Sequence, residues 1–68
     1  MDNKISMRAA RVNAGLTQVD VASQMHISPM TVHLWEHGKV VPKPAQFEMF
    51  CRLCGRSSEL IILPKKST

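Results

Sequence analysis

Hydrophobic residues recur every three or four positions along most of this 68-residue chain, a spacing that predicts amphipathic helices. The first helix is predicted to end at Gly15, and its apolar stripe consists of Ile5, Ala9, Val12 and Leu16. A later helix is predicted to begin at Pro44 and end at Gly55, with a stripe made of Phe47, Phe50, Cys51 and Cys54. Residues 40–44 read as an extended connection, because each proline disfavours helical backbone in the residue before it.

Two short helices are predicted between these segments. Thr17 and Asp20 form a T-x-x-D capping-box pattern, and apolar residues at helical spacing follow, namely Val19, Ala22 and Met25. After residues 26–27 leave the first helix, Ser28 is a good N-cap for the second. Pro29 occupies the first helical position, where its missing N–H costs nothing.

The second short helix has an inward side marked by Val32 and Trp35, and Gly38 ends it. Two capped helices joined by a short turn make a helix-turn-helix. A last short turn of helix through Ile62 is predicted after Ser57 or Ser58, before Pro64 breaks it.

Several spaced motifs carry a resemblance to a known family. They are R-x-N-A-G-L-T-Q at residues 11–18, V-A at 21–22, I-S at 27–28, T-V at 31–32 and W-E-H-G-K at 35–39. These residues resemble the Cro/repressor-type helix-turn-helix family of phage and bacterial regulators, over about residues 7–55. The resemblance implies an all-α bundle of four or five helices that binds operator DNA, usually as a dimer. We expect one such domain over residues 1–63 and a frayed tail at 64–68.

The charge of the chain agrees with this interpretation. The formal net charge of +4 suits a polyanionic partner or an acidic membrane surface. Between residues 21 and 47 the only acid is Glu36, so an internal ion pair of Glu36 would leave this half of the molecule purely positive. The alternative is an ordinary basic surface.

No stretch approaches the ~18 apolar residues that a membrane span needs, and residues 1–5 lack the apolar centre of a signal peptide. We therefore expect a cytoplasmic protein.

The resemblance implies phosphate contacts from the start of the first short helix and from the loop after the second. The expected phosphate-binding residues are Thr17, Gln18, His37, Lys39 and Lys43. Gln18 matches a family residue that reaches the DNA backbone, and Lys39 and Lys43 match a basic loop. The alternative for the two lysines is simple solubility.

The outward side of the second short helix is expected to contact bases through Ser28, Pro29, Met30, Thr31, His33 and Leu34. Pro29 and Met30 cannot form the bidentate hydrogen bonds that distinguish bases, although they can touch thymine methyl groups. His33 can donate to guanine, whereas Thr31 could contribute a hydroxyl or only cap the helix. Specificity then depends more on van der Waals contacts, water and DNA shape.

The same apolar side favours a second hypothesis. A patch made of Pro29, Met30 and Leu34 beside basic groups could bind another regulator protein, so the chain could act as an antirepressor. A general nucleic-acid binder is a third, weaker alternative.

Arg11 and Glu36 match family positions that form a partly buried salt bridge between the first helix and the end of the second short helix. A guanidinium bound to a carboxylate is directional and would fix that angle. Trp35 is interpreted as a core residue that seats the second short helix.

The spacing C-x-x-C at Cys51 and Cys54 and the pair His33 and His37 raise the possibility of zinc or redox chemistry. We interpret both cysteines as core residues, because they share the apolar stripe with Phe47. The histidines are expected on the opposite, outward side, so we expect no metal and no cofactor. Scattered acids (Asp20, Glu48 and Glu59), with no glycine-rich phosphate loop and no Ser-His-Asp arrangement, argue against an enzyme.

The C-terminal segment Leu60, Ile61, Ile62 and Leu63 is apolar on all sides. We expect part of it to join the core and part to contact a second subunit in a homodimer. The alternatives are a dimer that forms only on DNA and a monomer that buries the segment against its first helix.

Overall fold

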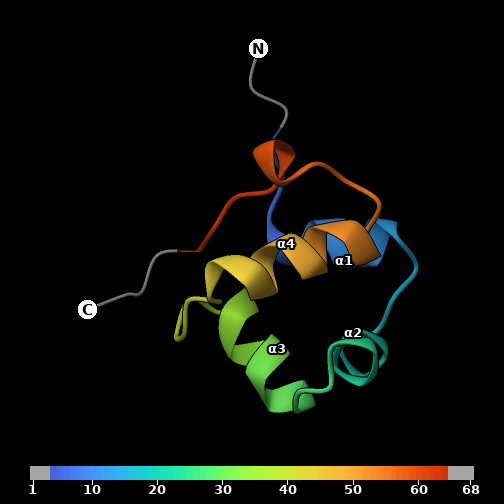
Figure 1. The fold of residues 1–68 in the computed structure, drawn as a ribbon, viewed down its shortest axis with the longest axis vertical. Coiled ribbons are helices and arrows are strands. Elements are labelled where there is room, and N and C mark those ends of the chain that lie inside the picture. The colour runs from blue at the N-terminus through green and yellow to red at the C-terminus, as the bar shows by residue number, and fades with distance from the viewer. Residues whose placement is uncertain (1–3, 65–68) are drawn as a thin grey trace.

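The computed structural model describes residues 4–64, which form four helices and one 3-10 turn (Figure 1). The elements are α1 (Met7–Asn13), α2 (Gln18–Met25), α3 (Pro29–Glu36), α4 (Pro44–Leu53) and η1 (Ser58–Leu60). The described residues contain one isolated β-bridge and no longer strand. The predicted all-α fold with a helix-turn-helix is therefore confirmed. No described helix is long and apolar enough to cross a membrane.

The first helix begins later than the sequence pattern predicted. Ser6 caps α1, because its side chain accepts a hydrogen bond from the Ala9 N–H at 3.0 Å. Ile5 precedes the helix and pairs with the C-terminal segment instead. The predicted stripe is wrong for Val12, which is 56% exposed, and the buried residues of α1 are Met7, Ala10 and Arg11.

The second helix begins as predicted but buries a different residue. The capping box is confirmed: the Asp20 N–H donates to Thr17 Oγ1, and the Thr17 N–H donates to the Asp20 carboxylate at 2.9 Å. Val19, predicted to face the core, is 61% exposed, whereas Val21 is fully buried. Ala22 and Met25 are buried as predicted.

The third and fourth helices follow the sequence pattern closely. Val32 and Trp35 of α3 are buried, and Gly38 after this helix has a positive φ of 68° that favours glycine. In α4, Phe47, Phe50 and Cys51 are buried. Cys54 is half-buried against the same core.

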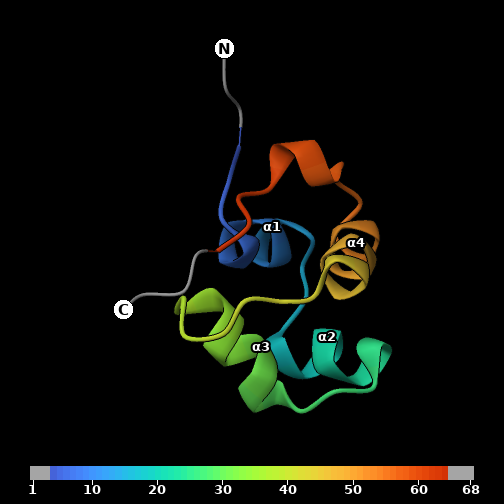
Figure 2. The ribbon, with the colours of Figure 1, turned by 60° about the vertical axis from the view of Figure 1, so that its left-hand side comes forward.

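The C-terminal segment departs from the prediction of a helical turn through Ile62. Only η1 is helical, and the chain then becomes extended and pairs in parallel with Ile5 beside the start of α1 (Figure 2). The Ile5 N–H donates to the Leu60 carbonyl at 2.9 Å, and the Ile62 N–H donates to the Ile5 carbonyl at 2.8 Å. This pairing inserts Ile61, 2% exposed, into the core.

The predicted tail at 64–68 lies, apart from Pro64, outside the described residues.

Candidate nucleic-acid interface

The α2–α3 turn is short because one residue takes a left-handed conformation. His26 ends α2 with a φ of 58°, a conformation that histidine adopts more readily than most residues. The Ile27 N–H then donates to the Ala22 carbonyl at 3.0 Å. Because two residues separate α2 from the cap of α3, the two helices pack directly against each other.

The start of α3 is closed by its own cap. Ser28 Oγ accepts a hydrogen bond from the Thr31 N–H at 3.2 Å, and the hydroxyls of Ser28 and Thr31 lie 3.3 Å apart. Thr31 is half-buried. The structure thus gives both hydroxyls a role in capping, which was the alternative predicted for Thr31.

On the outward side of α3, the side chains at the start of the helix are more exposed than those nearer its end. Pro29 and Met30 are exposed, and the exposed fraction of Met30 is 61%. His33 and Leu34 are half-buried. The most accessible side chains at the start of α3 are therefore apolar, which leaves His33 as the main hydrogen-bonding group on this side.

His33 and His37 stack at the end of α3. Their ring centroids lie 4.0 Å apart, and His37 Nδ1 lies 2.9 Å from the His33 carbonyl oxygen. This contact leaves Nε2 of His37 as the ring nitrogen available to an external partner.

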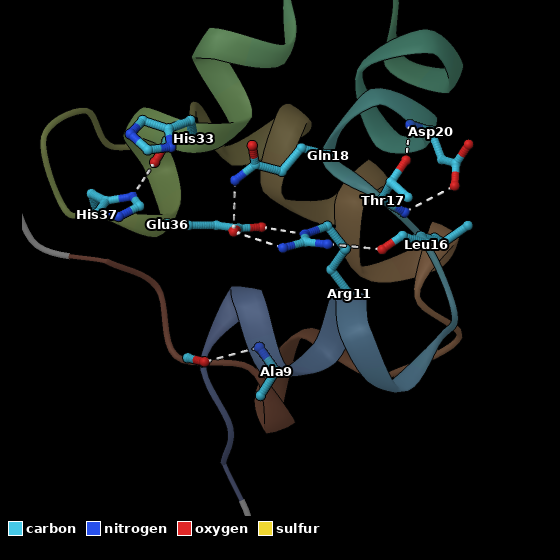
Figure 3. A network of polar contacts seen from close by, with 10 residues as sticks. Ala9, Arg11, Leu16, Thr17, Gln18, Asp20, His33, Glu36 and His37 are labelled. Atoms are coloured by element: carbon cyan, nitrogen blue, oxygen red, sulfur yellow. Dashed lines mark hydrogen bonds and ion pairs between the residues drawn. The ribbon is translucent and has the colours of Figure 1, made fainter.

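A carboxylate connects the first three helices of the fold (Figure 3). Glu36, the last residue of α3, accepts two hydrogen bonds from Arg11 of α1, at 2.6 Å from Nε and 3.1 Å from Nη2. Arg11 Nη1 also donates to the Leu16 carbonyl at 2.8 Å. The side chain of Glu36 is 1% exposed and that of Arg11 is 11% exposed. The salt bridge implied by the resemblance is therefore present and bidentate.

Gln18, the first residue of α2, is the third partner of this carboxylate. Its Nε2 donates to Glu36 Oε1 at 3.1 Å. Sequence reasoning missed this contact, since no local periodicity relates two side chains that are distant along the chain. One amide hydrogen of Gln18 is thus held internally, and the other remains available to a ligand at the start of α2.

Burial disfavours the ionised form of Glu36, but the hydrogen bonds from Arg11 and Gln18 and the charge of Arg11 outweigh it. The pKa of Glu36 is therefore lowered. The charge of Glu36 is neutralised inside the protein by Arg11. Since Glu36 is the only acid between residues 21 and 47, this part of the chain has no exposed acid. Its basic or imidazole side chains are His26, His33, His37, Lys39 and Lys43.

The loop after α3 presents the two predicted lysines to solvent. Lys39 and Lys43 are exposed, and the Lys39 N–H donates to the Leu34 carbonyl at 2.9 Å. Lys43 precedes α4, and its N–H donates to Gln46 Oε1 at 2.9 Å. Thr17, the remaining predicted phosphate contact, has its hydroxyl oxygen engaged by the Asp20 N–H but is itself exposed.

The lowered pKa of Glu36 leads to a test of this network. We expect the carboxyl carbon of Glu36, followed by nuclear magnetic resonance, to titrate below the ordinary value of 4.5. Because the folded-state pKa is lower than the unfolded one, the salt bridge stabilises the fold above the unfolded pKa. This contribution should disappear as the pH falls from about 5 through the folded pKa. Titration of Glu36 at or above 4.5 in the folded protein would contradict the network.

Both cysteine thiols lie against the core and are hard to ionise. Burial raises the pKa of the Cys51 thiol, and it raises the pKa of Cys54 to about 11. Both thiols are therefore protonated near neutral pH and are poor nucleophiles. Within residues 4–64, no three metal-ligating side chains come together.

Comparison with known proteins identifies the family of this arrangement. Residues 6–61 match the sequence profile of the family described as helix-turn-helix domain. The match begins at the cap of α1 and ends at the buried residue of the β-bridge. Comparison with curated proteins and with solved structures gave no match.

Proposed function

Because the chain belongs to the helix-turn-helix domain family, we propose that it binds duplex DNA with α3 in the major groove. The observation that carries the proposal is that α3 is exposed at its start and fixed to the core at its end. Pro29 and Met30 are exposed, whereas Trp35 is buried and Glu36 is held by the salt bridge with Arg11. A rigid support of this kind holds reading side chains at a fixed distance from base edges.

Phosphate binding is proposed for residues on both sides of α3. Gln18 and Thr17 lie at the start of α2, where unpaired backbone N–H groups favour anions. Lys39 and Lys43 lie in the loop after α3, together with His37 at the end of the helix. Such contacts supply affinity and fix the register of the protein on the duplex, but they carry little sequence information.

Base recognition is proposed for the outward side of α3. His33 donates to an acceptor such as guanine O6 or N7, while Pro29, Met30 and Leu34 contact thymine methyl groups. Ser28 and Thr31, which are engaged in the cap, contribute through the hydroxyl hydrogen-bonding capacity that capping leaves free. DNA shape supplies the remaining specificity.

We further propose that the protein is a phage- or mobile-element-type repressor of the Cro kind. Repression would follow from occupying an operator that overlaps a promoter, which requires only the fold that spans residues 6–61.

A homodimer on a palindromic operator completes this proposal, with two copies of α3 about 34 Å apart. Ile61 supplies the part of the C-terminal segment that joins the core, because it is 2% exposed, and it is therefore not proposed as a dimer contact. Ile62, 50% exposed, and Leu60, 37% exposed, are the proposed contacts with the second copy. Dimerisation only on DNA remains compatible with this surface.

The second candidate function is an antirepressor that docks on another regulator through α3. The exposed side chains of Pro29 and Met30 favour it, because a flexible methionine suits a protein interface.

Selection from random duplexes, followed by affinity measurements across salt concentrations, separates the two functions. A sequence-specific binder should prefer its selected site over nonspecific duplex by about 10³-fold or more. An antirepressor should show only weak association that high salt abolishes. Failure to enrich any sequence would overturn the repressor proposal.

Lys43 and His33 should affect DNA binding in different ways. Lys43→Ala should weaken binding to all DNA sequences equally and reduce the slope of log affinity against log salt by about 1. His33→Ala should instead relax the sequence preference at one base pair. Arg52→Ala is the matched control for Lys43→Ala, because it removes one exposed positive charge from α4. Equal loss from the two alanine variants at Lys43 and Arg52 would contradict the proposed phosphate contact.

A further inference from the structure

The described part of the molecule contains a mostly apolar pocket of about 300 Å³ between α4, η1 and the C-terminal segment. Its apolar walls are Pro42, Pro44, Phe47 and Leu63. Two carboxylates, Glu48 and Glu59, also line it. We call this feature the acidic pocket.

The two carboxylates stand out because exposed acids are scarce on this chain. The sequence holds five acids. Asp2 lies outside the described residues, and Glu36 is buried in its salt bridge. The exposed acids that remain are Asp20, Glu48 and Glu59, so two of these three line one pocket. Asp20 is engaged in the cap of α2, whereas Glu48 and Glu59 form no ion pair or hydrogen bond through their side chains with residues 4–64.

The walls of the acidic pocket are largely preformed. Phe47 is 9% exposed and is anchored in the core, and Pro42 is buried. Two prolines restrict the backbone on one side, so a ligand does not need to order that wall. Leu63, by contrast, is 47% exposed and has apolar surface left to bury.

The acidic pocket is separate from the proposed reading surface. Both views of the fold place η1, which carries Ser58 and Glu59 of the pocket wall, at the opposite end of the molecule from the α2–α3 turn (Figures 1 and 2). Its other wall adjoins Lys43, which lies between Pro42 and Pro44. An occupant would therefore lie beside bound DNA and would not displace α3.

We propose that the acidic pocket binds a segment of another protein in which an apolar side chain lies next to lysine or arginine. The apolar side chain fills the space between Phe47 and Leu63, which removes its surface and theirs from water. Glu48 and Glu59 attract and orient the neighbouring cation, which selects basic partners over acidic ones. Because the pocket lies away from the α2–α3 turn, a copy of the chain that is bound to DNA through α3 can at the same time bind a second protein on the same DNA.

Peptide titration tests the proposal without DNA. The probe is a capped hexapeptide with two leucines between an arginine and a lysine, added to isotopically labelled protein and followed by amide resonance shifts. We expect saturable shifts at Phe47, Glu48, Ser58, Glu59 and Leu63, with little change along α2 and α3. Peptides with serine in place of leucine, or glutamate in place of the cations, should bind at least about tenfold more weakly.

Two double variants distinguish the effect of the pocket carboxylates from the effect of the net charge of the protein. Glu48→Gln/Glu59→Gln should weaken the basic peptide about tenfold. The exposed pair Asn13→Lys/Ser23→Lys makes the same change of +2 in net charge away from the pocket and should have a much smaller effect. Leu63→Ser, at an exposed position, removes part of the apolar wall and should also weaken binding.

Three results would overturn the proposal. One is the absence of saturable shifts at millimolar peptide, and another is equally tight binding of the glutamate or serine peptides. The third is a shift of the Phe47 and Glu48 resonances with protein concentration in the absence of peptide. These two residues are not next to the proposed dimer contacts in the sequence, so such a shift would assign the pocket itself to a second copy of the chain.

Discussion

Glu36→Ala should unfold most of the protein under conditions in which the parent is folded. The substitution leaves the guanidinium of Arg11, 11% exposed, without its carboxylate, and such a loss typically costs about 3–5 kcal/mol. A domain of this size rarely has more than about 3–5 kcal/mol of total stability. We expect the melting temperature, measured by circular dichroism, to fall by about 12 °C or more.

Glu36→Gln is the control that separates charge from hydrogen bonding. The amide oxygen can still accept from Arg11 or Gln18, so the loss of stability should be smaller than for alanine. A melting temperature for Glu36→Ala within a few degrees of the parent would contradict the structural role of the salt bridge.

Met30→Glu should abolish DNA binding while leaving the fold intact. Met30 is 61% exposed in the first turn of α3, so its replacement removes little packing. An acid in the first helical turn is also favourable to the helix dipole. In the proposed complex the same carboxylate would face the negatively charged duplex without a partner, and we expect affinity to fall at least about 100-fold.

Met49→Glu is the matched control for this prediction. It is the same substitution at a second exposed methionine, 48% exposed and located in α4, and it changes the net charge identically. We expect less than about a threefold loss of DNA affinity, arising only from the long-range charge. If both variants lost affinity equally, or if Met30→Glu bound DNA as well as the parent, α3 would not be the element in the groove.

Local signals explain why the starts of three helices were predictable. Thr17 with Asp20, Ser28 with Pro29, and Pro44 each act within one helical turn of the boundary they set. The buried sides of α3 and α4 were also predicted correctly, because the bulkiest apolar residues, such as Trp35 and Phe50, mark one side of each helix.

The remaining features depend on contacts between distant parts of the chain. In α1 and α2, small and β-branched residues occur at helical spacing on two neighbouring sides of the helix, so the sequence does not reveal which side is buried. The pattern predicted buried Val12 and Val19, whereas the fold buries Ala10 and Val21. The extended path of Ile61 follows from pairing with Ile5, which no local periodicity reveals.

The candidate site was predictable to a similar extent. The Arg11–Glu36 pair followed from resemblance to a family, whereas the hydrogen bond from Gln18 became visible only when three helix ends were placed together. The acidic pocket likewise brings Glu48 and Glu59 together across an intervening turn.

The pairing of Ile5 with Ile61 makes opening of the chain measurable at single amides. The N–H groups of Ile5 and Ile62 are bonded across a loop that contains all four helices, so solvent deuterium reaches them only when the two ends separate. Their exchange rates can be compared with those of amides inside α4. Equal protection would mean that the ends belong to the same cooperative unit as the core, and faster exchange would define them as a separately opening unit.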